Sequence, residues 1–202
     1  MYEGILFDFD GVIADSEPLH FAAWGEALKP LGITLDWETY CANGIGLADD
    51  ELLSFLGRSA NPAIPLERLW ERYPVKLALF KERCLREPPI PPATIKFLKS
   101  LNGYKLALVT STARVEVEPV LDQSGIKQRF QALVYGEDVA RHKPAPDPYL
   151  LAAERLGIRS ALVVEDSEAG LASGRAAGFD VLRVTEPGRM PEVVRMRLGI
   201  FR

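Results

Sequence analysis

The stretch Gly4-Ile5-Leu6-Phe7-Asp8-Phe9-Asp10-Gly11 opens the chain with a continuous apolar run that ends in two acidic residues. An uninterrupted apolar run of this kind is typical of a strand that is buried on both faces of a parallel sheet. The two aspartates come where this strand would end. Because ligands of open parallel sheets bind at the carboxyl ends of the strands, the stretch predicts both an α/β fold and the location of its site.

The second half of the chain repeats this pattern as strand and helix units. Gly157 and Gly178 follow two of the predicted helices, as C-terminal caps do. We therefore predict a Rossmann-like parallel sheet that is covered by helices on both faces. The further strands are expected at residues 105–110, 132–135, 161–165 and 180–184, and the helices between them at 114–123, 147–156 and 168–177.

An insertion separates the first predicted strand from the second, because the gap of about 95 residues is far longer than one crossover helix needs. Proline-containing stretches at 15–18 and 88–92 bound this insertion and favour extended or turn backbone. We expect a discontinuous core of residues 1–15 and 89–202 with a small helical cap, residues 16–88. Apolar residues recur at helical spacing over 18–31, 36–42, 49–56 and 66–86.

The composition excludes several classes of protein. The 202 residues are 48% hydrophobic and 26% charged, which is typical of a globular protein rather than a disordered one. The net charge of −4 argues against nucleic-acid binding, and no apolar stretch is long enough to cross a membrane. Cys41 and Cys84 stand alone, so neither a disulfide nor a metal-thiolate site is expected. We expect a cytoplasmic protein that is a monomer, although no sequence feature decides its oligomeric state.

Acidic residues follow two of the predicted strands. Asp8 and Asp10 are separated by one residue, so their side chains leave nearly the same face of the strand. Glu165 and Asp166 come at the end of a neighbouring strand. Carboxylate oxygens are hard ligands, which suit Mg²⁺ and suit neither Zn²⁺ nor copper. The four acids therefore predict a Mg²⁺ site.

Phosphoryl transfer is the chemistry that this set of residues favours. Asp8 could attack phosphorus, Asp10 could protonate the leaving group, Lys143 could balance the charge, and Thr110, with Ser111 beside it, could bind the phosphate. Each residue alone has a simpler interpretation: a turn aspartate, a helix N-cap hydroxyl or a solvated lysine. Taken together, however, these residues follow the strands of one predicted sheet in the right order. This favours a functional site over the separate simpler interpretations.

Four runs of sequence resemble the motifs of the haloacid dehalogenase superfamily, in its β-phosphoglucomutase and sugar-phosphate phosphatase branch. They are Asp8-Phe9-Asp10-Gly11-Val12-Ile13-Ala14-Asp15-Ser16, Val109-Thr110-Ser111, Lys143-Pro144-Ala145-Pro146-Asp147-Pro148-Tyr149 and Val164-Glu165-Asp166-Ser167-Glu168-Ala169-Gly170. The resemblance implies that Asp8 is the phosphorylated nucleophile. It also implies that Asp10 is the acid/base, whose backbone carbonyl binds Mg²⁺.

The same resemblance implies further roles. Thr110 matches the hydroxyl of the second motif and Lys143 the lysine of the third, while Glu165 and Asp166 match the pair of acidic metal ligands. Because Asp10 follows Asp8 at this spacing, phosphoryl transfer is favoured over dehalogenation.

Two residues of the predicted cap match residues that β-phosphoglucomutase-like proteins carry near the substrate. His20 and Lys76 are therefore candidate substrate-binding residues. The alternatives are a partly exposed histidine near a helix start and a solvated helix lysine.

One departure from the mutase pattern bears on the reaction. Mutases carry a cap arginine that would grip a second phosphate, and the matching run here, Gly44-Ile45-Gly46-Leu47-Ala48-Asp49, has Leu47 in its place. We therefore expect hydrolysis of a small phosphorylated metabolite, with β-phosphoglucomutase activity as the alternative.

A signalling module that accepts a phosphoryl group on Asp8 is an alternative of another class. Two features argue against it: Asp10 would speed the loss of the phosphoryl group, and a receiver domain of ordinary size does not need the cap.

Overall fold

The computed structural model describes residues 2–45 and 48–200. The chain divides into two compact units: Met1–Asp15 with Pro89–Arg202, and Ser16–Pro88. The backbone N–H of Asp15 donates to the carbonyl of Pro89 at 2.9 Å. The chain therefore leaves the first unit and returns to it at adjacent points.

The first unit is built on a parallel sheet with the strand order β3-β2-β1-β4-β5. The register places Phe7 of β1 opposite Leu108 of β2 and Val164 of β4, so the three strands end level with one another. Each strand lies within its predicted range, but β2, β3 and β5 end one residue early, and β1 ends at Phe7 instead of the predicted Phe9. The strands are β1 (Gly4–Phe7), β2 (Lys105–Val109), β3 (Ala132–Val134), β4 (Ala161–Glu165) and β5 (Asp180–Arg183).

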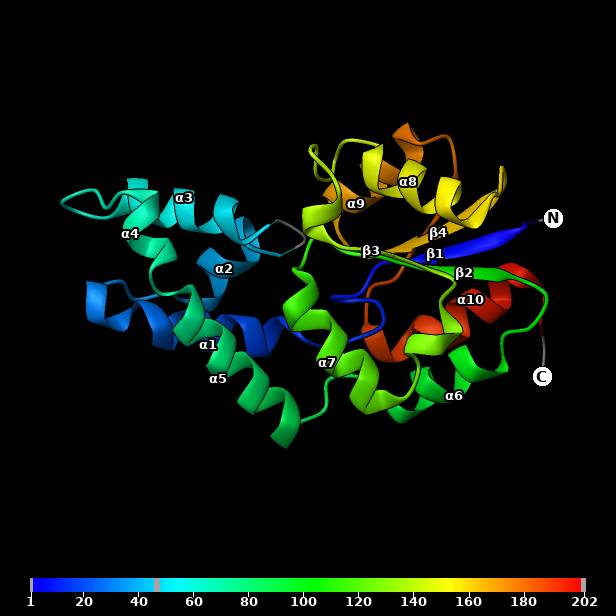
Figure 1. Cartoon of the computed structure of the whole chain (residues 1–202), viewed down its shortest axis with the longest axis horizontal. Helices are drawn as coiled ribbons and strands as arrows, with labels where there is room; N and C mark the ends of the chain where they lie inside the picture. The colour runs from blue at the N-terminus through cyan, green and yellow to red at the C-terminus, as the bar shows by residue number, and fades with distance from the viewer. Residues whose placement is uncertain (1, 46–47, 201–202) are drawn as a thin grey trace. The chain divides into compact units, whose positions relative to one another are not determined.

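Helices cover both faces of this sheet (Figure 1), which confirms the predicted fold class. One face is covered by α8 (Asp147–Leu156) and α9 (Glu168–Ala176), and the other by α6 (Pro92–Ser100), α7 (Arg114–Ser124) and α10 (Met190–Leu198). The sequence did not predict α6 and α10, because prolines at their starts read as turn signals. Proline is tolerated in the first turn of a helix, where its missing N–H would have no partner. Short 3₁₀ turns complete this unit: η2 (Lys127–Arg129), η3 (Gly136–Asp138) and η4 (Pro187–Arg189).

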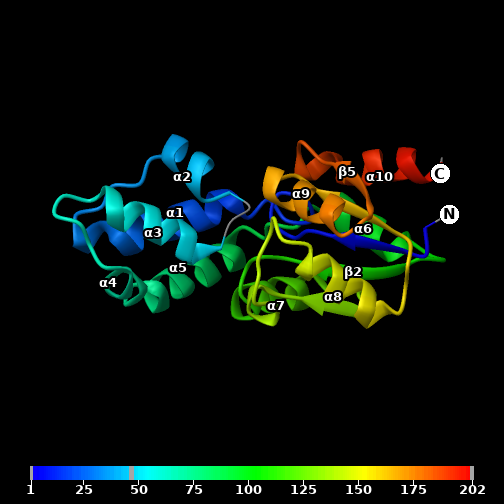
Figure 2. The ribbon, with the colours of Figure 1, turned by 90° about the horizontal axis from the view of Figure 1, so that it is seen from above.

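The second unit is helical. Its helices are α1 (Glu17–Leu28), α2 (Trp37–Asn43), α3 (Asp49–Ser59), α4 (Leu66–Trp70) and α5 (Tyr73–Arg86), with the 3₁₀ turn η1 (Lys29–Leu31) after α1. Helices α1 and α5 lie side by side (Figure 2), and Trp24, Leu53 and Leu69 form part of the apolar core. The prediction of one helix over 66–86 is wrong. Pro74 lies in the first turn of α5, and a helix running through it would clash at the preceding turn.

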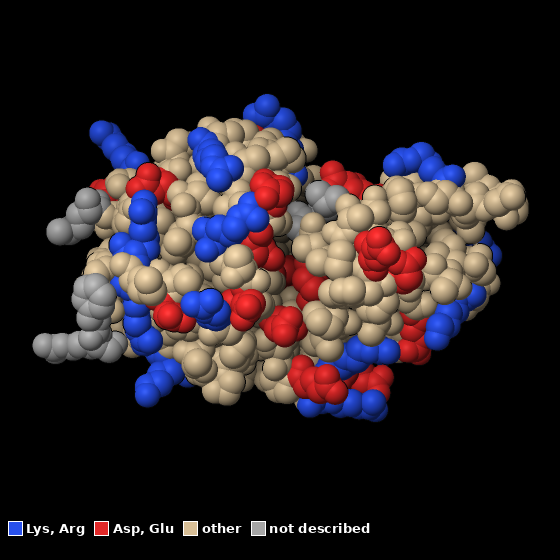
Figure 3. Space-filling model, turned by 180° about the vertical axis from the view of Figure 1, so that it is seen from behind, with Lys and Arg blue, Asp and Glu red and all other residues tan. Residues whose placement is uncertain are grey.

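The surface carries both signs of charge. Figure 3 shows basic and acidic side chains on the same face of the first unit. Within residues 2–45 and 48–200, no helix has the length and apolar character needed to cross a membrane.

Candidate active site

The turn after β1 places Asp8 and Asp10 at the carboxyl end of the sheet. The N–H of Asp8 donates to the carbonyl of Val164 at 3.0 Å, which keeps residue 8 in line with the sheet. Gly11 then adopts a positive φ of 73°, and a Cβ added there would lie 1.9 Å from Oδ2 of Asp166. Glycine is therefore required at this turn, both for its backbone conformation and for the close approach of the Asp166 carboxylate.

Lys143 is buried between acceptors from three strand ends. Its Nζ donates to Oδ1 of Asp8 at 2.7 Å, to Oε1 of Glu165 at 2.5 Å and to the carbonyl of Val109 at 3.1 Å. These three acceptors match the three protons of an ammonium group. Only 4% of Lys143 is exposed, so the alternative of a solvated lysine is wrong.

Glu165 is fully buried and accepts hydrogen bonds on both oxygens. Besides Lys143, Oε1 accepts from the Tyr149 hydroxyl at 2.7 Å. Oε2 accepts from the N–H groups of Asp166 and Ser167 and from the Ser167 hydroxyl, at 3.1, 3.3 and 3.2 Å. The carboxylate also lies against Gly170 of α9, where a Cβ would come within 1.8 Å of Oε1. Glu165 is thus a fixed acceptor that orients Lys143.

Three carboxylates gather around this lysine. Ligand oxygens of Asp8, Glu165 and Asp166 lie within 4.8 Å of one another. Burial raises the pKa of Asp8 well above its usual range and Glu165 raises it further, while Lys143 opposes the shift. Burial would lower the pKa of Lys143, but the charges of Asp8 and Glu165 outweigh it and hold that pKa above its ordinary value. One ammonium does not balance three carboxylates, so the cluster favours a divalent cation with oxygen ligands.

The carboxylate of Asp10 faces hydroxyls of the loop after β2. Oδ2 accepts from Oγ1 of Thr112 at 2.6 Å and, at the longer distance of 3.4 Å, from Oγ1 of Thr110. Sequence reasoning missed Thr112. Three hydroxyl residues follow one another at 110–112, and only the fold decides which of them faces Asp10. Ser111, the remaining hydroxyl residue of this run, is half-buried.

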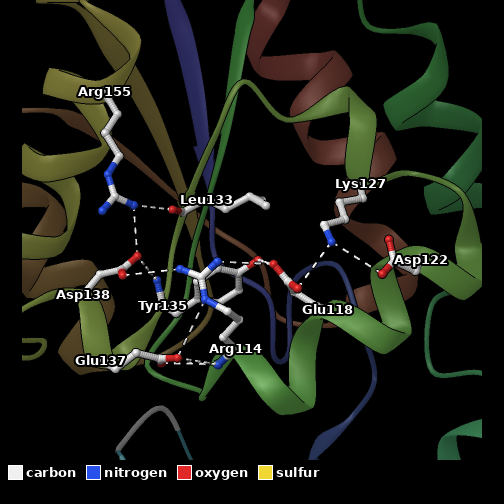
Figure 4. A network of polar contacts seen from close by, with 9 residues as sticks. All are labelled: Arg114, Glu118, Asp122, Lys127, Leu133, Tyr135, Glu137, Asp138 and Arg155. Carbon is white, nitrogen blue, oxygen red and sulfur yellow. Dashed lines mark hydrogen bonds and ion pairs between the residues drawn. The ribbon is translucent and has the colours of Figure 1, made fainter.

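The loop that carries Thr112 is fixed to the segment after β3. The N–H of Thr110 donates to the carbonyl of Val134 at 2.9 Å, and that of Gly136 donates to the carbonyl of Thr112 at 3.2 Å. The N–H of Arg114 donates to the Glu137 carboxylate at 3.2 Å (Figure 4).

The same network holds the start of α7 against η3. The Arg114 guanidinium lies 4.4 Å from the ring centroid of Tyr135, whose hydroxyl donates to Glu118 at 3.1 Å (Figure 4). Asp138 accepts from Arg155 at 2.9 Å and from the N–H of Tyr135 at 3.2 Å. The geometry of the loop at the site is therefore supported by contacts outside it.

The second unit holds His20 and Lys76 in an aromatic cluster. Lys76 is fully buried, which makes the alternative of a solvated lysine wrong, and its Nζ lies 2.9 Å from Oδ2 of Asp49. The other oxygen of Asp49 accepts from Nε1 of Trp24 at 2.7 Å. His20 is also buried, and its ring stacks on Phe80 at 4.1 Å between centroids. Leu47, on which the argument against a mutase depends, lies outside the described residues.

Comparison with known proteins confirms the family resemblance. Residues 5–184 match the model of the haloacid dehalogenase-like hydrolases. The chain is 34% identical over 193 residues to fructose-1-phosphate phosphatase YqaB of Escherichia coli (strain K12), covering 91% of this chain and 96% of that protein. It is 32% identical over 181 residues to the phosphorylated carbohydrates phosphatase of Thermotoga maritima, covering 88% and 82%. The crystal structure of CbbY from Rhodobacter sphaeroides in complex with phosphate has a TM-score of 0.79 at 28% identity, covering 91% and 87%.

Proposed function

The chain belongs to the haloacid dehalogenase-like hydrolase family, and we propose that it is a Mg²⁺-dependent phosphatase acting through an aspartyl phosphate at Asp8. The substrate class is a small phosphomonoester such as a sugar phosphate, since two similar proteins are named as phosphatases of fructose 1-phosphate and of phosphorylated carbohydrates. The observation that carries the proposal is the buried Lys143, held between Asp8 and Glu165.

The donor set fits Mg²⁺. Asp8 and Asp166 would hold the ion through carboxylate oxygens, with the backbone carbonyl of Asp10 as a further ligand. Glu165 adds negative charge, but its oxygens already accept five hydrogen bonds. When bound, the ion offsets the excess charge of the carboxylates and polarises the phosphoryl oxygens.

The residues of the chain then divide the chemistry into two steps. An oxygen of Asp8 attacks phosphorus, the bond from phosphorus to the leaving oxygen breaks, and Asp10 gives that oxygen a proton. Asp10 next takes a proton from water, the water oxygen attacks phosphorus, and the bond to Asp8 breaks. Lys143 orients Asp8 and stabilises the negative charge of the phosphoryl group, and Thr110 donates a hydrogen bond to it.

Within the second unit, we propose His20 and Lys76 as substrate-binding residues.

Phosphate release from a panel of sugar phosphates and other phosphomonoesters tests the function. We expect release that requires Mg²⁺, stops with EDTA and is lost in Asp8→Asn, while Asp122→Asn, at an exposed position of α7, stays active. Absence of release on every substrate contradicts the proposal, and so does an active Asp8→Asn variant.

The intermediate has its own test. Borohydride reduces an aspartyl phosphate to homoserine, so quenching during turnover and peptide mass spectrometry should find homoserine at position 8. A phosphoryl group that persists on Asp8 for minutes would instead favour a signalling module. Conversion of β-glucose 1-phosphate to glucose 6-phosphate with a bisphosphate primer would favour a mutase.

A further inference from the structure

Thr112 makes the shorter of the two described hydroxyl contacts to Asp10. Its Oγ1 lies 2.6 Å from Oδ2 of Asp10, whereas Oγ1 of Thr110 lies 3.4 Å from the same oxygen. Hydrogen bonds from a hydroxyl to a carboxylate are strong at about 2.5–2.7 Å and weaken well before 3.4 Å. Of these two hydroxyls, that of Thr112 therefore holds Asp10 more firmly.

The backbone of Thr112 is itself fixed. Its N–H donates to Oγ1 of Thr110 at 3.0 Å, and its carbonyl accepts from the N–H of Gly136 at 3.2 Å. The next anchor is Arg114, whose N–H is held by the carboxylate of Glu137. Hydrogen bonds before and after Thr112 therefore fix the loop that carries its hydroxyl.

Asp10 needs such a support. An aspartate carboxylate rotates broadly about its terminal torsion, and proton transfer requires the acid within hydrogen-bond reach of the reacting oxygen. Backbone hydrogen bonds to the carbonyl of Phe9 set the turn that carries Asp10, whereas the hydroxyls of Thr112 and Thr110 act on its carboxylate directly.

We propose that Thr112 is the positioning residue for Asp10, holding its carboxylate in the orientation from which it transfers a proton. This inference rests on the proposed function and adds a role that none of the sequence motifs assigns. Thr112 acts through Asp10 and not on the phosphoryl group. Removing the Thr112 hydroxyl should therefore slow the reaction most for substrates whose leaving group has to be protonated.

The test compares Thr112→Val, which keeps the shape and removes the hydroxyl, with Thr112→Ser, which keeps the hydroxyl. Thr185→Val, an exposed threonine after β5, is the matched control. Single-turnover release of the leaving group is measured with p-nitrophenyl phosphate, whose leaving group departs without a proton, and with the best alkyl phosphate of the panel. This rate reports only the first step.

For the alkyl phosphate, we expect Thr112→Val to lose about 10- to 100-fold in rate, a part of the 10²- to 10⁴-fold that general acid catalysis supplies. Its KM should stay within about twofold, because binding does not use this contact. With p-nitrophenyl phosphate the loss should be under about threefold, and Thr112→Ser should recover most of the alkyl phosphate rate.

Three results would each overturn the inference. They are an equal fall in rate on both substrates for Thr112→Val, a rise in KM in place of a fall in rate, and a Thr112→Ser variant as slow as Thr112→Val. Thermal melting shows whether Thr112→Val is folded, and Thr112→Ala replaces it in the same comparison if it is not. A wild-type protein that is inactive on every substrate would overturn the proposed function. An active wild type with an unaffected Thr112→Val would overturn this inference alone.

Discussion

Lys143 is a single buried cation shared by two buried carboxylates. Its charge offsets part of the repulsion between Asp8 and Glu165, and the pKa of Asp8 is nevertheless raised by burial and by Glu165. A carboxyl group whose pKa is raised by folding keeps a proton that the unfolded chain releases. The contribution of Asp8 to the free energy of unfolding in the absence of metal therefore falls as the pH rises above about 4.

Replacing this lysine should be costly. Lys143→Met leaves two buried carboxylates without their cation, and we expect the free energy of unfolding at pH 7 to fall by about 3–5 kcal/mol. The loss should be smaller at pH 5 than at pH 7, because the raised pKa of Asp8 favours its protonated form as the pH falls. Urea denaturation without divalent ions measures both values.

Lys127→Met is the matched control, because Lys127 pairs with Glu118 and Asp122 at a partly exposed position. Lys127→Met should lower the free energy of unfolding by less than about 1 kcal/mol. A Lys143→Met variant as stable as this control would contradict the buried-cation account.

Helix α9 packs so closely on β4 that a glycine is needed between them. In the interior of a helix, Gly→Ala commonly stabilises by about 1 kcal/mol. At Gly170, however, a Cβ would lie 1.8–2.2 Å from the atoms of the Glu165 carboxyl group. The added methyl group would displace the acceptor that orients Lys143.

We expect Gly170→Ala to lower the free energy of unfolding by about 1–3 kcal/mol, as overpacking does, and to reduce phosphatase activity. Gly25→Ala in α1, where a Cβ would meet no atom within 4 Å, should stabilise by about 1 kcal/mol. Urea denaturation of the two variants shows whether each substitution raises or lowers the free energy of unfolding. Stabilisation by Gly170→Ala would show that α9 and β4 are less tightly packed than described.

The segment between β3 and α8 is stabilised by Asp138. Burial acts to raise the pKa of Asp138, but hydrogen bonds from Arg155 and from the N–H of Tyr135 outweigh it and lower that pKa. Because its pKa is lower in the folded state, its stabilising effect is present above about pH 4 and is lost as the pH falls. Asp138→Asn should therefore cost about 1 kcal/mol at pH 7 and almost nothing near pH 2.

Chemical denaturation of wild type and Asp138→Asn over this pH range measures the difference. A difference that stays constant with pH would mean that Asp138 acts through shape and not through its charge.

The two compact units suggest that the first folds without the second. Asp15 and Pro89 are joined by a hydrogen bond of 2.9 Å, so a short Gly-Ser linker can replace residues 16–88. We expect the shortened chain to unfold in one cooperative transition by circular dichroism and to give a dispersed amide NMR spectrum. A gradual, non-cooperative transition would show that the first unit depends on the second.

Local pattern predicted the strands and most of the site, because apolar runs and the polar residues that end them are neighbours in sequence. Asp8 directly follows β1 and Asp166 directly follows β4, whereas Lys143 lies in the segment between β3 and α8. The burial of Lys76 and the contact of Thr112 with Asp10 could not be predicted, because side-chain surroundings depend on segments distant along the chain. The helices α6 and α10 were missed for a local reason, since proline marks both a turn and the first turn of a helix.

The position of β1 in the centre of the sheet has a consequence for biosynthesis. Leu6 pairs with Ala107 on one side and with Val163 on the other, so β1 is synthesised long before the two strands with which it pairs. Pairing over such sequence separations is slow to form, because a long loop has to close first. Asp8 meets Lys143 and Glu165 only after β4 has been translated. A product truncated before β4 therefore lacks this cluster of buried charges.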